Sequence, residues 1–312
     1  MVVLPSTYSM IVMKNFFYIG LFVMLLAGCG SSDELLTIYT SQDQVYAEPI
    51  LREFEKQSGV KVRAVYDSEA VKTVGLVNRL IAEKNNPQCD LFWNNEELRT
   101  HQLITRGVLD MGLGVETFGE RTRQWVWNTN HLSRADIPDN LSTLTNVQWR
   151  GKVVIALPLF GSTSTHFQIL RQQWGERLWH QWCKALIAND IMTVDGNSIV
   201  VQLVGRGEAI LGLTDSDDVR SGLKNQLPIE GKKIVNDGFV IRNSIGYVTG
   251  SPNSNLARRL SNYLQSQSVR RALINAGALD PFSTVAAQDI DWPSVVVENE
   301  ITVNDLKSIF LD

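Results

Sequence analysis

Residues 152–174, KVVIALPLFGSTSTHFQILRQQW, combine the pattern of a strand, a loop rich in hydroxyl groups and the start of a helix. The stretch begins with a β-branched apolar run, Val153 to Ile155, which predicts a buried strand that ends at Pro158. The loop that follows holds Gly161 and four hydroxyl residues in a row: Ser162, Thr163, Ser164 and Thr165. A helical pattern begins after them. A helix that starts behind a glycine and hydroxyl groups presents unpaired amide N–H groups and its positive end to an anion, so the stretch predicts one wall of a binding cleft.

The gross composition is that of a folded globular protein. With 312 residues the chain is long enough for two lobes or one large α/β domain, and its hydrophobic content is 44%. The formal net charge is −4. Because a nucleic-acid-binding protein needs a basic face, we expect no nucleic-acid partner.

The N-terminal segment is typical of an export signal and a tether. Lys14 is followed by an apolar run, residues 16–27, which is too short to span a bilayer comfortably and fits the core of a signal peptide. The run leads into Leu-Ala-Gly-Cys, ending at Cys29, which matches the lipobox of bacterial lipoproteins. We therefore predict a lipoprotein signal peptide over residues 1–28, lipidation of Cys29, and a lipidated tether over residues 29–34.

Strand and helix patterns alternate in the chain that follows. Short apolar runs at 35–40, 61–66 and 89–93 predict strands, and helical spacing appears at 46–58 and 68–84. Such alternation predicts a parallel sheet with helices on both faces, in which ligands bind at the carboxyl ends of the strands. The polar residues at those ends are candidate ligand contacts: Ser41, Gln42, Asp43, Ser68, Asn94, Asn95 and Glu96.

Two more strands are expected beyond the opening stretch, at 191–194 and 209–213, after a tryptophan-rich core helix at 176–188. The loops that follow these strands add four candidate contacts: Asn197, Thr214, Asp215 and Asp217. One acid of the run at 214–218 is expected to cap the next helix instead of meeting a ligand.

The two groups of candidates favour ligand groups of opposite charge. The hydroxyl run at 162–165 favours an oxyanion such as phosphate, phosphonate, sulfonate or carboxylate. The acids at 214–218 favour a cation, either a metal ion or an organic amine. A zwitterion such as an amino acid or an aminoalkyl phosphonate satisfies both ends, with Trp93 and Tyr66 expected beside it.

Five stretches of the chain, taken in order, resemble one known family. Each is weak alone, but their order and spacing between residues 36 and 264, behind a lipobox, are specific. They read LTIYTSQDQVYAEPILREFEKQSGVKV, YDSEAVKTVGLVNRLIAEKNNPQCDLFWNNE, WRGKVVIALPLFGSTSTH, GEAILGLTDSDD and IRNSIGYVTGSPNSNLARRLSNYL. The chain resembles the substrate-binding lipoproteins of bacterial ABC importers, in the branch that contains the ferric-ion-binding proteins.

The resemblance implies the type II periplasmic-binding-protein fold, with two α/β lobes, each a mostly parallel sheet flanked by helices, joined by a two-strand hinge. Lobe one is then expected at 35–125 plus 244–312 and lobe two at 130–240, with crossovers at 124–130 and 239–244. The lobes would close over a small ligand and present it to an ABC permease and its ATPase. The chain would work as a lipid-anchored monomer outside the cytoplasm, on the periplasmic side in a Gram-negative host.

The chain departs from the ferric-binding branch at one point. Those proteins hold iron with tyrosine phenolates, typically an adjacent pair where this chain has Thr214 to Ser216, and no tyrosine occurs here between His131 and Val240. Oxygen ligands for a hard cation would have to come from carboxylates instead: Asp43, Glu96, Asp215, Asp217 or Asp218. We therefore favour an oxyanion or zwitterion as the ligand. Ferric or another metal ion remains the alternative, and the sequence identifies no cofactor.

Two other classes of function were weighed. The chain has no G-x-S-x-G elbow, P-loop or H-E-x-x-H motif, so an enzyme is not expected. A receptor that passes ligand binding to a signalling partner would share all the features above. Permease and ATPase genes beside this one would favour import, and a sensor-kinase gene would favour signalling.

Overall fold

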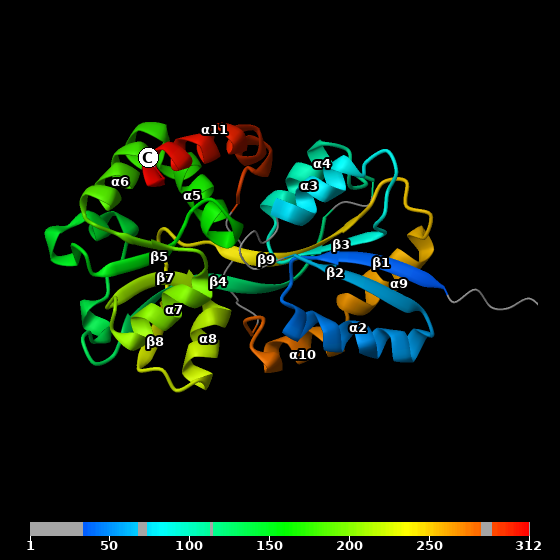
Figure 1. Ribbon diagram of the computed structural model, residues 1–312, viewed down its shortest axis with the longest axis horizontal. Coiled ribbons are helices and arrows are strands. Elements are labelled where there is room, and N and C mark those ends of the chain that lie inside the picture. The colour runs from blue at the N-terminus through cyan, green and yellow to red at the C-terminus, as the bar shows by residue number, and fades with distance from the viewer. Residues whose placement is uncertain (1–33, 68–73, 113–114, 282–288, 312) are drawn as a thin grey trace, which may run out of the picture. The chain divides into compact units, whose positions relative to one another are not determined.

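The computed structural model describes residues 34–67, 74–112, 115–281 and 289–311. The strands are β1 (Leu35–Thr40), β2 (Lys61–Tyr66), β3 (Leu91–Asn94), β4 (Glu116–Asn128), β5 (Val153–Ala156), β6 (Met192–Val194), β7 (Leu211–Asp215), β8 (Ile229–Lys233) and β9 (Val240–Tyr247). The helices are α2 (Gln44–Ser58), α3 (Val74–Ala82), α4 (Leu98–Thr105), α5 (Gly161–Trp174), α6 (Glu176–Ala188), α7 (Asn197–Arg206), α8 (Ser216–Lys224), α9 (Ser254–Leu264), α10 (Gln267–Ala276) and α11 (Trp292–Phe310) (Figure 1). Among the described residues, no helix has the length and apolarity needed to cross a membrane.

The strands form a mixed sheet in the order β2-β1-β3-β9-β4-β7-β5-β6, with β8 paired to β4. β1 runs parallel to β3, and β5 runs parallel to β6 and β7, whereas β4 and β9 are antiparallel to the strands beside them. We call β1 to β3, together with α2 to α4, α9 and α10, lobe one. We call β5 to β8, together with α5 to α8, lobe two. Both lobes alternate strand and helix, as the sequence pattern predicts.

β4 and β9 connect the two lobes. Residues 116–122 of β4 pair with β9, and residues 123–128 pair with β7 and β8. β9 in turn pairs with β3 through residues 244–247. The residue bounds that the sequence gives for the crossovers, 124–130 and 239–244, remain a prediction.

A bulge interrupts the pairing of β4 with β9. Phe118 pairs with Asn243 and Glu120 pairs with Arg242, so the ladder skips Gly119. The φ angle of Gly119 is +67°, which side chains disfavour, and a Cβ added there would collide with Leu279. Both conformation and space therefore require glycine at this position.

Each lobe has its own apolar core. Trp125 and Trp127 of β4 pack in lobe two with Trp179 and Trp182 of α6, so the prediction that the tryptophan-rich helix serves the core is confirmed. Trp93 is fully buried in the lobe-one core, with its ring centroid 5.8 Å from that of Phe118. The expectation that Trp93 lies beside the ligand is wrong, because β3 turns its side chain into the core.

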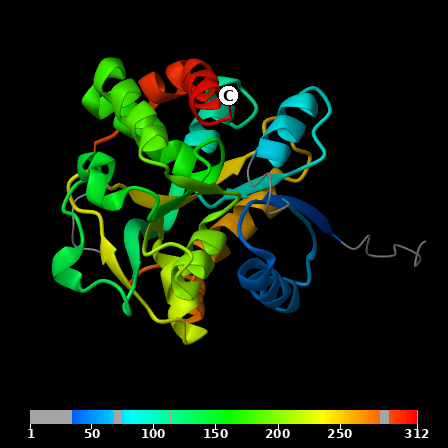
Figure 2. The same cartoon turned by 60° about the vertical axis from the view of Figure 1, so that its left-hand side comes forward.

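Helix α11 packs against elements of both lobes (Figures 1 and 2). Leu306 is buried in the lobe-two core, while Asn299 accepts a hydrogen bond of 3.1 Å from Arg99 of α4. The rings of Trp292 and His101 stack with their centroids 5.0 Å apart. The sequence pattern predicts a shorter helix at 303–310, in the segment expected to belong to lobe one. A local pattern cannot show the contacts that α11 makes with α5 and α6.

Two local boundaries differ from the sequence pattern. Helix α5 begins at Gly161, so the hydroxyl residues lie inside its first turns and not in a loop; Phe160 is extended, and its carbonyl accepts from Ser164 N at 3.1 Å. Strand β8 (IEGKK) is not predicted at all, because it is mostly polar. It pairs with β4 but lies outside the continuous order of the other strands. A strand at such an edge position can carry polar side chains.

Candidate ligand-binding site

A cavity of about 480 Å³ lies at the carboxyl ends of the strands of both lobes. Residues at the ends of β1, β2, β3, β5, β6 and β7, or directly after them, line it. This is the edge at which sheets of this kind bind their ligands. The volume suits a small molecule.

Four helices, α2, α5, α7 and α8, begin with residues that line the cavity. The first N–H groups of a helix have no acceptor within the helix, and the helix N-terminus carries a partial positive charge. Thr163 of α5 donates a hydrogen bond of 3.2 Å from its hydroxyl to Asn197 of α7, which holds these two helix starts together. The cavity therefore offers an oxyanion amide donors from two adjoining helices.

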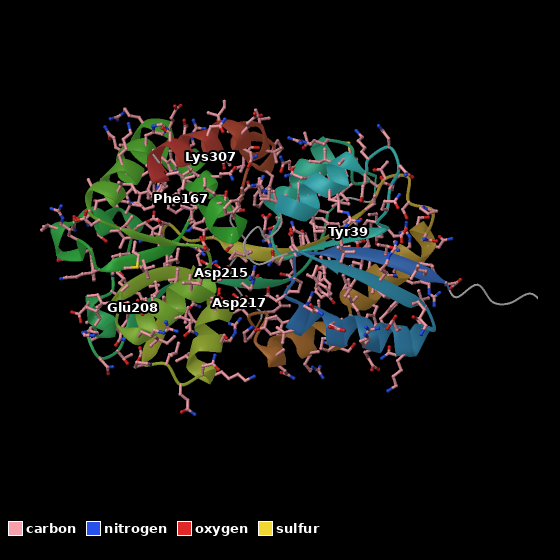
Figure 3. The ribbon with its side chains drawn as sticks, viewed as in Figure 1. Tyr39, Phe167, Glu208, Asp215, Asp217 and Lys307 are labelled. Atoms are coloured by element: carbon pink, nitrogen blue, oxygen red, sulfur yellow. The ribbon has the colours of Figure 1, made fainter. Side chains whose placement is uncertain are left out.

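Asp215 at the end of β7 is the centre of a buried polar network (Figure 3). Its Oδ1 accepts from Arg123 Nη1 at 2.5 Å, and its Oδ2 accepts from Ser162 Oγ at 2.6 Å and from Asn197 Nδ2 at 3.3 Å. Burial acts to raise the pKa of Asp215, but the guanidinium groups of Arg123 and Arg121 outweigh burial and hold this pKa below its ordinary value. Asp215 is thus an anion that joins α5 and α7 to β4.

Arg121 extends from β4 to the cavity and pairs with Asp217 in the first turn of α8. Its Nη1 lies 2.8 Å from Asp217 Oδ2 and 3.8 Å from Asp215 Oδ2, while its Nη2 donates to the carbonyl of Asn95 at 2.8 Å. Burial raises the pKa of Asp217, although Arg121 opposes this shift. The other oxygen, Asp217 Oδ1, is buried and has no hydrogen-bond partner within the described part of the chain.

Aromatic side chains from both lobes complete the wall: Tyr46, Tyr66 and Phe160. Burial raises the pKa of Tyr66 to about 12. Burial also raises the pKa of Tyr46, and the nearby carboxylates of Asp217 and Asp43 add to that shift. Both phenols are neutral near pH 7 in the metal-free protein, where they offer ring faces and hydroxyl groups to a ligand.

The wall of the cavity is acidic. Arg121 is the one basic side chain among its described lining residues, and the acids are Asp43, Asp67, Asp195, Asp215, Asp217 and Asp218. Arg123 pairs with Asp215 from behind the wall. The excess of negative charge attracts a ligand group of positive charge.

Most of the candidates chosen from the sequence meet at this cavity. Those that line it are Ser41, Gln42, Asp43, Asn95, Gly161, Ser162, Thr163, Asn197, Asp215 and Asp217. Tyr66, expected beside the ligand, lines it as well. Ser68 and the lipidation candidate Cys29 lie outside the described residues.

Five candidates are buried and do not line the cavity: Asn94, Glu96, Ser164, Thr165 and Thr214. Glu96 accepts from the amide of Leu98 at 2.7 Å and from the hydroxyl of Thr165 at 3.1 Å, so it serves the start of α4. Ser164 accepts from Gln168 Nε2 at 3.1 Å. A helix turns about 100° per residue, so Ser164 lies about 200° round the helix from Ser162 and faces away from the cavity. Thr165 lies almost one turn further along the helix, where its hydroxyl donates to Glu96 and to the carbonyl of Gly161.

The lining residues that were not among the candidates include Tyr46, Asp67, Arg121 and Asp195. Asp195 follows a strand that was predicted, so the same rule about strand ends could have selected it. Arg121 and Arg123 alternate along β4 and are both buried, which is rare for arginine. Two arginines separated by one residue, shortly before the apolar residues Trp125 to Trp127, are the signal that could have identified this pair.

Comparisons with known proteins agree with this geometry. The sequence pattern of a family described as bacterial extracellular solute-binding protein matches residues 36–278. An Fe(3+)-binding periplasmic protein of Serratia marcescens is 26% identical over 206 residues, which are 60% of this chain and 58% of that protein. The chain thus spans little more than half the length of this curated relative.

Solved structures share the fold across nearly the whole chain. Iron-bound HitA from Pseudomonas aeruginosa has a TM-score of 0.76 at 16% identity, covering 89% of this chain and 99% of that one. AfuA from Actinobacillus pleuropneumoniae, solved with fructose-6-phosphate bound, has a TM-score of 0.77 at 19% identity and covers 90% and 99%. A ferric binding protein from Campylobacter jejuni has a TM-score of 0.78 at 15% identity and covers 88% and 99%.

These likenesses confirm the two-lobed periplasmic-binding-protein fold predicted from the sequence. At such identities they establish the fold alone, and the ligands named for these structures, iron and a phosphosugar, belong to different chemical classes. The family match covers most of the chain and also indicates a location outside the cytoplasm. The chain therefore belongs to the family of bacterial extracellular solute-binding proteins.

Proposed function

We propose that this protein is the solute receptor of an ABC import system and that its ligand is a small zwitterion. The cavity between the lobes captures the ligand, and the closed form delivers it to a membrane permease and its ATPase. The observation that carries the choice of ligand is the division of the cavity wall into a side rich in amide donors and a side rich in carboxylates.

The anionic end of the ligand is assigned to the adjoining starts of α5 and α7. Gly161, Ser162 and Asn197 line the cavity there, and first-turn amides are ready donors for a carboxylate or phosphonate. Asp215, the acid nearest to this point, is paired with Arg123 and bonded to Ser162, so its charge is largely compensated.

The cationic end of the ligand is assigned to the acids of α8 and lobe one. Asp217, Asp218 and Asp43 line this side of the cavity, and the tyrosine rings of Tyr46 and Tyr66 line it with them. Carboxylates beside aromatic faces are a favourable environment for an organic ammonium group. An oxyanion without a positive charge would meet this acidic side with Arg121, already paired with Asp217, as the one basic side chain among the described lining residues.

Capture follows from contacts with both lobes. A ligand that bridges them favours the closed state by the difference between its affinities for the closed and open forms. β4 and β9 are the connections about which such closure takes place.

Isothermal titration with matched compounds tests the proposal. We expect an aminoalkyl phosphonate or an amino acid to bind, and the matching alkyl phosphonate, which lacks the amine, and alkyl amine, which lacks the acid, to bind at least tenfold more weakly, since each loses one charged contact. Tight binding of Fe(III) with no response to any zwitterion would contradict the assignment.

A matched pair of variants tests the position of the anionic end. The double change Ser162→Ala and Thr163→Ala removes two hydroxyls that tie α5 to Asp215 and Asn197, so binding of the zwitterion should weaken about thirtyfold, at about 1 kcal/mol for each bond. Ser164→Ala is the control, because Ser164 lies behind the wall. Equal losses in both variants would place the anion elsewhere.

Capture of a metal ion is the second candidate. It is favoured by the carboxylate oxygens of Asp215, Asp217 and Asp218, which lie within 4.8 Å of one another, and by the iron-binding names of several relatives. The titration with Fe(III) separates this candidate from the first.

The location proposed for the receptor is the outer face of the cell membrane. The signal-like segment and the lipobox cysteine at residue 29 support lipid anchoring of a monomer, and the family match supports export. A sensing role in place of import would use the same cavity.

A further inference from the structure

We infer that Arg121 determines the class of solute that this receptor accepts, because its guanidinium group is a tethered cation that fills the carboxylate cluster of Asp215, Asp217 and Asp218 and thereby excludes metal ions. The inference deepens the proposed function and rests on it, since a receptor for an organic zwitterion has to reject the free cations that its acidic wall would attract.

The carboxylate cluster has the chemistry of a site for a hard cation. Its three acids each place an oxygen within 4.8 Å of the others, and oxygen donors at such spacing suit calcium, manganese or a trivalent ion. The side chain of Asp217 is nine-tenths buried, and its Oδ1 has no hydrogen-bond partner in the described ranges of the chain. A buried carboxylate oxygen without a partner is costly, and it points to a cation as the missing neighbour.

The guanidinium group already occupies the place that a metal ion would take. Nη1 of Arg121 lies 2.8 Å from Asp217 Oδ2 and 3.8 Å from Asp215 Oδ2, between the two acids. An ion bound to the same oxygens at about 2.3–2.6 Å would collide with Nη1 and would also be repelled by its charge.

Arg121 is held in this position from both ends. Its backbone belongs to β4, where it pairs with Ile241 of β9, and its Nη2 donates to the carbonyl of Asn95 at 2.8 Å. Its side chain is only 7% exposed, so it cannot leave the cluster for solvent without moving through packed neighbours. Arg123 compensates Asp215 separately, which leaves Arg121 as the counter-ion of Asp217.

Replacing Arg121 by a neutral residue should therefore create a metal site. In Arg121→Gln the carboxylate of Asp217 loses its paired guanidinium group, and Asp43, which acts electrostatically on Asp217, faces the same space. We expect Tb³⁺, followed by its luminescence, and Mn²⁺, followed by titration calorimetry, to bind the Arg121→Gln protein at least tenfold more tightly than the wild type.

Two further variants separate this gain from general damage. Arg121→Gln combined with Asp217→Asn removes the central carboxylate and should return metal binding to the wild-type level. Arg220→Gln is the matched control, because Arg220 also lies on the acidic side of α8 but pairs with Asp280, outside the cluster; it should gain no metal binding. Arg121→Lys keeps a positive charge and should gain none either.

The loss of a buried counter-ion also weakens folding, so stability is measured together with binding. If Arg121→Gln is only marginally folded without metal, its thermal unfolding midpoint should rise with Tb³⁺ concentration, whereas that of the double variant should not. Wild-type protein that binds Tb³⁺ as tightly as Arg121→Gln overturns the inference, and so does a folded Arg121→Gln protein that binds no more tightly than wild type. Neither result depends on the zwitterion titration, so failure of the proposed function and failure of this inference are distinguishable.

Discussion

Asp217 and Tyr46 belong to different lobes yet influence each other across the cavity. The carboxylate of Asp217 contributes to the raised pKa of the Tyr46 phenol, which burial raises first. An aromatic ring beside a carboxylate is a favourable neighbour for an ammonium group, which is the role proposed for Tyr46.

Tyr46 provides the first test at the scale of a single residue. If its ring face stabilises the cationic end of the ligand, Tyr46→Phe should keep the affinity for the zwitterion and Tyr46→Ala should raise Kd about five- to thirtyfold, equivalent to about 1–2 kcal/mol. Titration calorimetry with the same zwitterion measures both variants. An unchanged Kd in Tyr46→Ala would show that the ring does not contact the ligand.

The sequence predicts residues of the site where a loop follows a strand, and it does less well elsewhere. Ser41, Asp43 and Asp215 follow from the rule that ligands bind at strand ends. Arg121 lies in the interior of a strand, and whether it faces a core, a cavity or solvent depends on pairing with β7 and β9, which are distant in sequence. Local patterns carry no information about that pairing.

Among the elements, α11 shows most clearly how tertiary contacts exceed what a helical pattern predicts. Its pattern identifies a short C-terminal helix, but the folded element is 19 residues long and packs on α4, α5 and α6. At the end nearest α4, the ring of Trp292 stacks on His101 at an interplanar angle of 15°. Burial lowers the pKa of His101 to about 4.

This contact predicts a pH dependence of stability. Because the pKa of His101 is lower in the folded protein than its ordinary value near 6.5, the unfolded chain binds more protons between about pH 4 and 6.5. The contribution to stability is complete above pH 6.5 and is lost as the pH falls through that window. After allowance for its partial exposure, the loss attributable to His101 is about 1–2 kcal/mol.

Urea unfolding of wild type and His101→Phe at pH 7 and pH 4.5 measures this effect. The phenylalanine ring keeps the stack on Trp292 but cannot be protonated, so the variant should lose less stability on acidification than the wild type. His131→Phe is the control, because His131 is exposed. If His101→Phe and wild type showed the same acid sensitivity, the stack would not contribute to it.

The fold could be predicted because the alternation of strand and helix patterns recurs along the chain. Each unit of strand and helix repeats the same alternation, and the order of family-like stretches arranges these units into two lobes. Strand β8 and the bulge at Gly119 could not be predicted in this way. Both depend on the tertiary surroundings of β4, which pairs with three strands along its length, β9, β7 and β8, and also contacts the helices α7 and α8.

The proposed lipid anchor at Cys29 predicts that the protein is attached to a membrane. Metabolic labelling with radioactive palmitate should label the wild type, and phase partitioning should place it with the detergent. Cys29→Ser should be unlabelled and should no longer partition with lipid-modified proteins. Cys89→Ser is the control, because Cys89 is buried in lobe one and should not affect the anchor. Labelling that survives in Cys29→Ser would contradict the proposed anchor.

The bulge at Gly119 also determines on which face of β4 each later side chain lies. Side chains of a strand alternate between faces with a period of two, so one extra residue reverses the faces of everything beyond it. Because Gly119 is skipped, Phe118 and Glu120 pair with neighbouring residues of β9. If position 119 took a regular place in the ladder instead, Arg121 and Arg123 would turn towards the opposite surface and leave Asp215 and Asp217 without counter-ions. The bulge at Gly119 therefore places Arg121 and Arg123 on the face of β4 where they pair with Asp217 and Asp215.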